Sequence, residues 1–299
     1  ISICVKEILD FLQIQPGQRG LDATLGYGGH TLEMLKCLKG EGHIYGLDVD
    51  PIESEKTKER LKKQGFGEDI LTVKLLNFRN IDQVAEEAGK FDFVLADLGV
   101  SSMQIDNPER GFSYKVDGPL DLRMNPQKGI SAAQRLKEVT QEELYGMLLE
   151  NADEPYAEEI SKAVIRQRRI RPVETTTDLK QVIEQALSFI PEKERKEAVK
   201  KSCQRSFQAL RIDVNSEFEV LYDFLEKLPQ VLAPNGRAAI LTFHSGEDRL
   251  VKKSFKQFYK EGIYSDISKN VIRPSQEECA RNSRARSTKM RWAIRAQEI

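Results

Sequence analysis

The sequence has few of the residues that build metal sites and disulfide frameworks. Its 299 residues include four cysteines and three histidines; the cysteines are scattered, with no C-x-x-C pair and no histidine spaced to complete a zinc site. We therefore expect reduced thiols, no metal and a cytoplasmic protein. No apolar run approaches membrane-spanning length, and the first residues have neither a signal-peptide core nor an arginine-rich transit pattern, so we expect no membrane partner.

The sequence also lacks a surplus of either charge. Lysine and arginine number 46, aspartate and glutamate 47, and the formal net charge is −1. This balance excludes a wholly basic protein that coats RNA, although it allows a local basic face. The length is sufficient for a full core in one large domain or two ordinary ones.

A glycine-rich turn between two apolar runs is the clearest motif that is present. Residues 19–50 read RGLDATLGYGGHTLEMLKCLKGEGHIYGLDVD, which predicts a strand, a glycine turn, a helix and a strand that ends at Asp48. Glycines let the backbone approach a ligand, and a carboxylate about 20 residues on can accept hydrogen bonds from both hydroxyls of a ribose. Because Gly26, Gly28 and Gly29 run G-x-G-G, the spacing favours S-adenosylmethionine over a dinucleotide. The alternative is a tight turn that needs positive φ.

Two further apolar runs are predicted to end at candidate site residues. Residues 71–76 form a strand followed by Phe78, and residues 91–95 form a strand that leads to Asp97. Ligands of open α/β folds bind at the carboxyl ends of the strands, so both residues are candidates. Phe78 is also compatible with an ordinary core ring, and Asp97 with a cap of the next turn.

The segment after the fourth predicted strand differs from the rest. Residues 107–125, NPERGFSYKVDGPLDLRMN, mix aromatic rings with glycine, proline and charge, which indicates a functional loop. From residue 131 to about residue 202 the apolar spacing is helical without a strand, which predicts an inserted all-helical subdomain. We expect the α/β domain to comprise residues 1–108 and 205–299, with the loop and insertion at residues 109–204. Four arginines of the insertion either meet phosphates or form a solvated helix end: Arg166, Arg168, Arg169 and Arg171.

The C-terminal part carries the remaining candidates. Residues 237–243 predict a strand that ends at Phe243 and His244; His244 binds a phosphate, passes on a proton, or is a buried histidine satisfied at a strand end. Residues 281–295 contain cations without an acid, which suits a nucleic-acid backbone. The same residues also fit the polar side of a terminal strand. The cations are Arg281, Arg284, Arg286, Lys289, Arg291 and Arg295.

Several blocks together resemble one family over nearly the whole chain. They are LDATLGYGGHT, LADLGVSSMQIDNPERGFSY, DGPLDLRMN, RSFQALRIDVNSE, LTFHSGEDRLVK and NSRARSTKMRW. The chain resembles the cytosine N4-methyltransferases of bacterial 16S ribosomal RNA, the RsmH or MraW family. The resemblance implies a Rossmann-like α/β methyltransferase sheet with an all-helical insertion, S-adenosylmethionine as cofactor, and a cytosine in the decoding region of the small ribosomal subunit as substrate. It also implies cofactor contacts at Gly28, Gly29, His30, Asp48, Phe78, Asp97 and Gln104.

The chain departs from the family pattern at three places. Gly246 stands where the family has leucine, residues 201–204 replace His-Pro-Ala-Thr, and residues 151–154 replace Tyr-Gly-Glu-Glu. These changes affect parts expected to face RNA more than the cofactor loop. They are compatible with a divergent second paralogue that methylates another nucleotide.

A mechanism follows from the proposed substrate. The N4 amine of cytosine is a poor nucleophile, so holding base and methyl group in register is the main contribution. We expect the base to be turned out and held by Phe112, Tyr114 and Phe243, any of which could instead be core. Asp97 either accepts a hydrogen bond from the amine or serves only the cofactor, and His244 is the second catalytic candidate. The residues expected to bind the RNA backbone are Arg281, Arg284 and Arg286.

Two other classes of function remain open from the sequence. A nicotinamide-dependent oxidoreductase could use the same half-sheet, but the glycine spacing argues against it. A protein that binds the ribosome without catalysis could keep the fold, although Asp48, Asp97 and Gln104 are retained. A homodimer is compatible with the sequence.

Overall fold

The computed structural model describes residues 1–298, which form two compact units. The first unit comprises residues 1–99 together with the chain from residue 219 on, and the second comprises residues 100–218. These boundaries differ from the expected ones at residues 108 and 204. The second boundary moves because helix α10 (Glu192–Val214) continues through residue 204 without a break.

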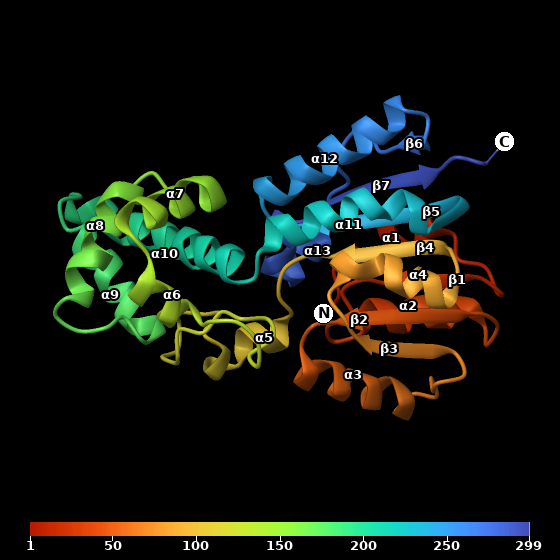
Figure 1. The fold of residues 1–299 in the computed structure, drawn as a ribbon, viewed down its shortest axis with the longest axis horizontal. Coiled ribbons are helices and arrows are strands. Elements are labelled where there is room, and N and C mark those ends of the chain that lie inside the picture. Colours follow the sequence, from red (N-terminus) through yellow and green to blue (C-terminus); the bar gives the residue numbers. More distant parts are fainter. Residues whose placement is uncertain (299) are drawn as a thin grey trace. The chain divides into compact units, whose positions relative to one another are not determined.

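The first unit contains a seven-stranded sheet in the order β3-β2-β1-β4-β5-β7-β6 (Figure 1). Strands β3, β2, β1, β4 and β5 are parallel, whereas β7 is antiparallel to both β5 and β6. The carboxyl ends of β1, β2, β4 and β5 therefore meet at one edge. The strands are β1 (Arg19–Asp22), β2 (His43–Asp48), β3 (Leu71–Leu75), β4 (Phe91–Asp97), β5 (Leu232–Thr242), β6 (Tyr264–Ile267) and β7 (Lys289–Arg295).

Helices cover both faces of this sheet because the central strands are apolar on both sides. On β4, Val94 and Ala96 belong to one buried cluster, and Phe93 and Leu95 belong to the other. This alternation follows from the two-residue period of a strand. The helices of the first unit are α1 (Val5–Leu12), α2 (Gly29–Leu38), α3 (Pro51–Lys63), α4 (Ile81–Ala88), α12 (Ser245–Lys260), α13 (Gln276–Arg281) and most of α11 (Glu217–Val231). The Rossmann-like α/β fold expected from the sequence is confirmed.

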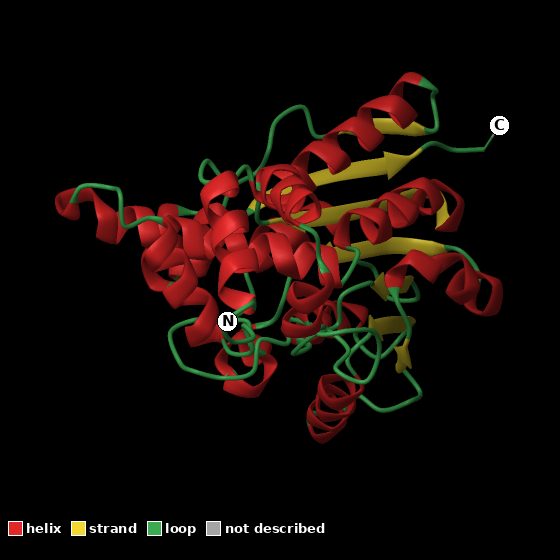
Figure 2. Cartoon of the chain, turned by 60° about the vertical axis from the view of Figure 1, so that its left-hand side comes forward, coloured by secondary structure: helices red, strands yellow, loops and turns green. Residues whose placement is uncertain are grey.

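The second unit is helical and has its own core. Among its described residues there is no named strand, as Figure 2 shows by colour. Its core joins Leu136, Leu148, Ile160, Ile183 and Leu210, each from a different helix. The helices are α5 (Ser102–Asp106), α6 (Ala132–Glu138), α7 (Gln141–Ala152), α8 (Ala157–Arg168), α9 (Thr176–Ala186) and α10. The predicted all-helical insertion is thus confirmed.

The residues that begin two of these helices form the caps typical of helix N-termini. Thr140 with Glu143 and Thr175 with Asp178 form complete capping boxes, in which side chains satisfy the first backbone N–H groups of α7 and α9. Within residues 1–298, no helix combines the length and apolar character needed to cross a membrane.

Candidate functional site

Two carboxylates stand at the ends of neighbouring central strands. Asp22 ends β1 and is buried; its carboxylate accepts hydrogen bonds from the Thr31 hydroxyl at 2.6 Å and from the Thr24 amide at 3.1 Å. Asp97 ends β4, and its amide donates to the Thr24 hydroxyl at 2.6 Å. Thr24 and Thr31 therefore connect the glycine turn to both strand ends. Asp22 was not among the expected site residues, although it is the acid of the motif LDATLGYGGHT.

His30 joins Asp97 to the start of the chain. Its Nε2 lies 2.7 Å from the Ile3 carbonyl oxygen, and its Nδ1 lies 3.5 Å from Oδ2 of Asp97. The His30 side chain is 9% exposed and that of Asp97 is 29% exposed. Burial raises the pKa of Asp97 to about 6; His30 lowers it, and the charges of Asp22 and Glu247 raise it further.

Asp48 ends β2 at the same edge. One of its carboxylate oxygens accepts a hydrogen bond from the Asp50 amide at 3.0 Å. Burial raises the pKa of Asp48 to about 7, and the charges of Asp50 and Glu53 add to the effect. Burial also raises the pKa of Asp22. The edge thus concentrates carboxylates that a cationic or hydroxyl-rich ligand would stabilise in their charged form.

The glycine turn leaves the first turn of α2 without a side-chain cap. Gly28 precedes α2 with a φ of 84°, and no side chain caps this helix. A Cβ on Gly28 would lie 2.7 Å from Cγ2 of Thr57, so a larger residue would meet both strain and a clash. Arg60 closes the outer side: it donates to the Tyr27 carbonyl at 3.0 Å and lies 3.7 Å from the centre of the Tyr27 ring.

Phe78 follows β3 and contacts the core of the first unit. Its ring meets the Phe224 ring edge-on, with centroids 5.1 Å apart. The side chain is nevertheless only partly buried. This geometry supports the alternative of a core ring and is compatible with a further contact on its open side.

Gln104 belongs to the second unit, where it completes a capping box. The Ser101 amide donates to Oε1 of Gln104 at 3.0 Å, and the Gln104 amide donates to the Ser101 hydroxyl at 3.2 Å. The box fixes the entry of α5, and Gln104 is buried. A structural role thus accompanies the expected cofactor contact.

The three aromatic rings expected to hold a base do not lie in one unit. Tyr114 packs on Phe207 of the helical core with ring centroids 5.4 Å apart, and Phe112 lies under the guanidinium of Arg110 at 5.9 Å. Phe243 belongs to the first unit and packs partly buried against its core. Each ring thus has a structural partner and also keeps an open side.

His244 caps helix α12. Its Nδ1 accepts a hydrogen bond from the Glu247 amide at 3.5 Å, while the Phe243 amide donates to the Glu247 carboxylate at 2.9 Å. Nε2 of His244 lies 3.1 Å from Oε1 of Glu247. This arrangement favours the alternative in which His244 makes its polar contacts within the protein, at the end of a strand. The catalytic role of His244 stays a prediction.

The basic C-terminal cluster divides into two kinds of residue. Arg281, Arg284 and Arg286 are exposed, and Arg281 forms an ion pair with Glu277. Arg291, in contrast, is buried and forms two hydrogen bonds to Asp248, at 2.7 and 3.1 Å. Phosphate binding by the exposed members stays a prediction, whereas Arg291 serves the fold.

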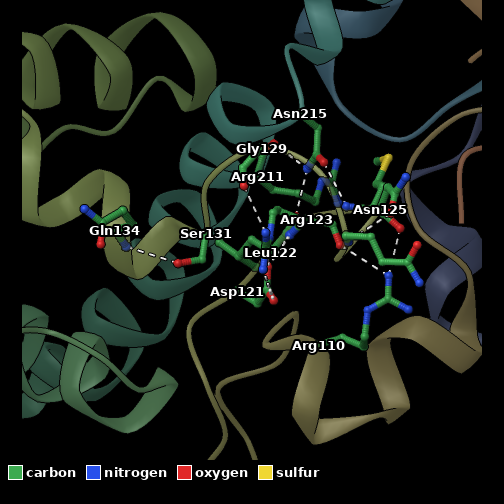
Figure 3. Close-up of polar contacts among 12 residues, drawn as sticks. Arg110, Asp121, Leu122, Arg123, Asn125, Gly129, Ser131, Gln134, Arg211 and Asn215 are labelled. Atoms are coloured by element: carbon green, nitrogen blue, oxygen red, sulfur yellow. Dashed lines mark hydrogen bonds and ion pairs between the residues drawn. The ribbon is translucent and has the colours of Figure 1, made fainter.

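A network in the second unit was not expected from the sequence. Nδ2 of Asn215 donates to the Leu122 carbonyl at 2.8 Å, and Oδ1 accepts from the Met124 amide at 2.8 Å. Buried Arg110 donates to the Met124 carbonyl at 2.8 Å. Figure 3 shows Asn215 and Arg110 on opposite sides of the segment between them. Leu122 has a φ of 63°, which is unusual for a residue with a side chain.

One group of three potential metal ligands occurs among residues 1–298. The ligand atoms of Cys4, Glu7 and Glu278 lie within 4.8 Å of one another. Burial raises the pKa of Cys4 to about 12, with further contributions from Glu7 and Glu278.

Comparison with known proteins extends over nearly the whole chain. A model of the MraW methylase family matches residues 1–296. The chain is 72% identical over 297 residues to ribosomal RNA small subunit methyltransferase H 1 of Lachnoclostridium phytofermentans, covering 99% of this chain and 81% of that protein. It is 66% identical over 296 residues to ribosomal RNA small subunit methyltransferase H 2 of Alkaliphilus metalliredigens, covering 99% and 85%. It is 39% identical over 298 residues to ribosomal RNA small subunit methyltransferase H of Koribacter versatilis, covering 99% and 93%.

Proposed function

This chain belongs to the MraW methylase family, and we propose that it methylates small-subunit ribosomal RNA with S-adenosylmethionine as the methyl donor. The observation that carries the proposal is the group of carboxylates at the ends of β1, β2 and β4, beside the uncapped start of α2. The substrate atom proposed is N4 of a cytosine in the decoding region of 16S RNA, acted on in the small subunit.

The residues at this edge fit a cationic cofactor. S-adenosylmethionine supplies, when bound, a methyl group on a positively charged sulfur. Asp48 is placed to accept hydrogen bonds from ribose hydroxyls, and Asp22 and Asp97 add negative charge at the neighbouring strand ends. Gly28 and Gly29 leave no room for a side chain, because a Cβ would meet Thr57 at the first position and Ser2 at the second. A dinucleotide would instead bring an anionic pyrophosphate against these carboxylates, which argues against the oxidoreductase alternative.

Asp97 is the best candidate for a direct role in the transfer. Its Oδ2 faces His30, so Oδ1 is the atom proposed to accept a hydrogen bond from the cytosine amine. That bond localises the nitrogen lone pair, and the carboxylate takes up the proton that the amine loses as the carbon–nitrogen bond forms. Asp97 could instead act only through cofactor contact, together with Phe78 and Gln104.

We assign the two units different tasks. The first unit binds the cofactor, and the loop and helices of the second unit bind RNA together with Arg281, Arg284 and Arg286. Phe112, Tyr114 and Phe243 are the proposed base contacts. The near-neutral net charge means that shape as well as phosphate attraction would select the ribosomal particle. The protein would act in the cytoplasm, where ribosomes assemble, as a monomer or a homodimer.

A second candidate differs only in the target nucleotide. Identity is 54–72% for the relatives whose names end in a number and 38–39% for those whose names do not, in line with the departures at Gly246, at residues 201–204 and at residues 151–154. A second paralogue with another target nucleotide would show this pattern.

The deciding experiment supplies the purified protein with methyl-labelled S-adenosylmethionine and small subunits from cells that lack the gene. Label in N4-methylcytidine after digestion would support the main proposal, and mapping would locate the nucleotide. Label in another nucleoside would favour the second candidate. Absence of both labelling and cofactor binding would reject the methyltransferase assignment for this chain.

A further inference from the structure

The side chain of Thr24 continues the hydrogen bonds of the sheet past the end of β1. Strand β1 ends at Asp22, which pairs with Leu95 of β4. Just beyond it, the Ala23 amide donates to the Leu95 carbonyl at 2.8 Å. Asp97 is the next residue of β4 whose backbone groups point toward β1, and its amide donates to the Thr24 hydroxyl at 2.6 Å. A side-chain oxygen thus takes the place of the backbone carbonyl that a longer β1 would offer.

The two sides of the end of β4 are therefore held by different kinds of group. On the side of β5, the Leu98 amide donates to the Leu241 carbonyl at 3.1 Å, and this bond does not depend on a side chain. On the side of β1, the bond depends on one hydroxyl, that of the partly buried Thr24. Asp97 stands at this end of the strand, so the direction of its carboxylate depends on the residue at position 24.

We propose that Thr24 is a positioning residue for methyl transfer, whose hydroxyl holds the end of β4 so that the Asp97 carboxylate faces the substrate amine. This inference rests on the proposed function, and Thr24 acts through Asp97 without touching the substrate. Thr24 also begins the turn that carries Gly26 and Gly28, so one residue sets the distance between the acid and the cofactor turn. Because a misplacement of about 1 Å can slow an enzyme by roughly 100-fold, this bond matters for the rate.

The Thr24 hydroxyl can serve two carboxylate residues at once. The Thr24 amide donates to Oδ1 of Asp22 at 3.1 Å, which places this residue beside a buried acid. Burial raises the pKa of Asp22, and a hydrogen bond from the Thr24 side chain is among the contacts that lower it. A hydroxyl donates one proton and accepts with its lone pairs, so it can donate to Asp22 while it accepts from the Asp97 amide. A valine of similar shape does neither.

The first test needs no ligand and follows hydrogen exchange at the Asp97 amide. We expect exchange about tenfold faster in Thr24→Val and within about threefold of wild type in Thr24→Ser, because serine keeps the hydroxyl. Thr24→Ala repeats the measurement without the bulk of the valine methyl group. Thr72→Val is the matched control, since Thr72 is a partly buried threonine of β3 whose hydroxyl lies 2.7 Å from Nε2 of His43. Equal protection in wild type and both hydroxyl-free variants at position 24, or an equal loss in Thr72→Val, would overturn the inference.

The second test measures single-turnover methyl transfer to small ribosomal subunits at saturating S-adenosylmethionine. We expect Thr24→Val to lower the rate by roughly 10- to 100-fold, and we expect Thr24→Ser and Thr72→Val to stay within about threefold of wild type. In protein that already carries Asp97→Asn, Thr24→Val should have little further effect, because its action passes through that acid. An undiminished rate in Thr24→Val, or a loss of the same size with and without Asp97→Asn, would reject the positioning role.

The two tests separate this inference from the proposed function. If the wild type transfers no methyl group to any RNA, the proposed function fails, and the exchange rates decide by themselves whether Thr24 holds Asp97. If the wild type is active and Thr24→Val is equally active, the proposed function stands and the role of Thr24 is rejected.

Discussion

The glycine turn of the first unit and the segment 121–125 of the second hold unusual backbone in opposite ways. The turn uses Gly26 and Gly28 at positive φ and leaves the start of α2 uncapped. The segment has Leu122 at positive φ and surrounds it with side-chain hydrogen bonds from Asn215 and Arg110. The difference teaches that the first backbone precedes a helix without a side-chain cap, whereas the second is already bonded by side chains.

Removing Asp48, the acid at the end of β2, should have the largest effect. Asp48→Ala is expected to weaken S-adenosylmethionine binding by roughly 100-fold or more, because two hydrogen bonds to a charged acceptor contribute about 1.5–3 kcal/mol each. Calorimetry measures it, and Glu68→Ala, which removes a carboxylate that is 86% exposed, is the matched control. Unchanged affinity would remove Asp48 from the site.

A side chain at Gly28 tests whether the turn needs glycine for space as well as conformation. Gly28 and Gly65 have φ angles of 84° and 94°, but only a Cβ on Gly28 meets a neighbour, Cγ2 of Thr57 at 2.7 Å. We expect Gly28→Ala to cost about 2–4 kcal/mol of unfolding free energy and Gly65→Ala about 1 kcal/mol, both by urea titration. Equal costs would show that conformation alone matters.

Asn215→Asp tests the hydrogen bonds that surround the segment 121–125. An aspartate cannot donate to the Leu122 and Arg211 carbonyls, which both accept from Nδ2 of Asn215. The expected cost is about 2 kcal/mol, with faster hydrogen exchange at the Met124 amide. Asn107→Asp is the control, since Asn107 only accepts from the Glu109 amide and aspartate can do the same. If the Met124 amide kept its protection, the network would not hold this segment.

Asp48 should also lower the stability of the ligand-free protein at high pH. The folded pKa of Asp48 is about 7, above its ordinary value of 3.8, so its stabilising contribution is complete below that ordinary value and is lost as the pH rises through 7. Asp48→Asn is therefore expected to be more stable than wild type at pH 8, by about 1–2 kcal/mol after allowance for solvent, and not at pH 3.5. Urea titrations at both pH values check this; an advantage that is equal at both would contradict it.

The smallest effect is expected outside both regions. Replacing Arg281, Arg284 and Arg286 together by alanine should make the salt dependence of RNA binding shallower, by about 0.7–0.9 in slope for each phosphate that the protein no longer neutralises. Lys56, Lys62 and Lys63 are likewise exposed, on α3 of the first unit, and serve as a charge-matched control. If both triple variants changed the slope equally, the C-terminal cluster would have no special role.

The sequence predicted the features that depend on local pattern. The ends of β2 and β4 at Asp48 and Asp97 follow from apolar runs of strand length, and the capping boxes of α7 and α9 follow from residue types three positions apart. The parallel order then brings the acids to one edge without further information.

The features that remained hidden depend on residues far apart in the chain. Asn215 lies 93 positions from Leu122, and His30 lies 27 positions from Ile3, so no local spacing reveals either contact. The role of His244 as a helix cap was hidden for a related reason, because it is apparent only from the Glu247 amide; its catalytic role stays a prediction. The expected boundary near residue 204 differs from that of the compact units, because α10 runs through this position without a break.

The helical insertion also sets the order in which the parts of this chain can fold during synthesis. Phe93 of β4 pairs with Arg237 of β5, so these adjacent strands are separated by the whole helical unit during synthesis. The three acids at the strand ends are translated early, and the helical unit, which has its own core, can fold once it has emerged. The sheet cannot be completed until β5 has been synthesised. Until then, the edge of β4 that pairs with β5 has no partner strand. This interval is when the nascent chain is most exposed to wrong pairing and to chaperones.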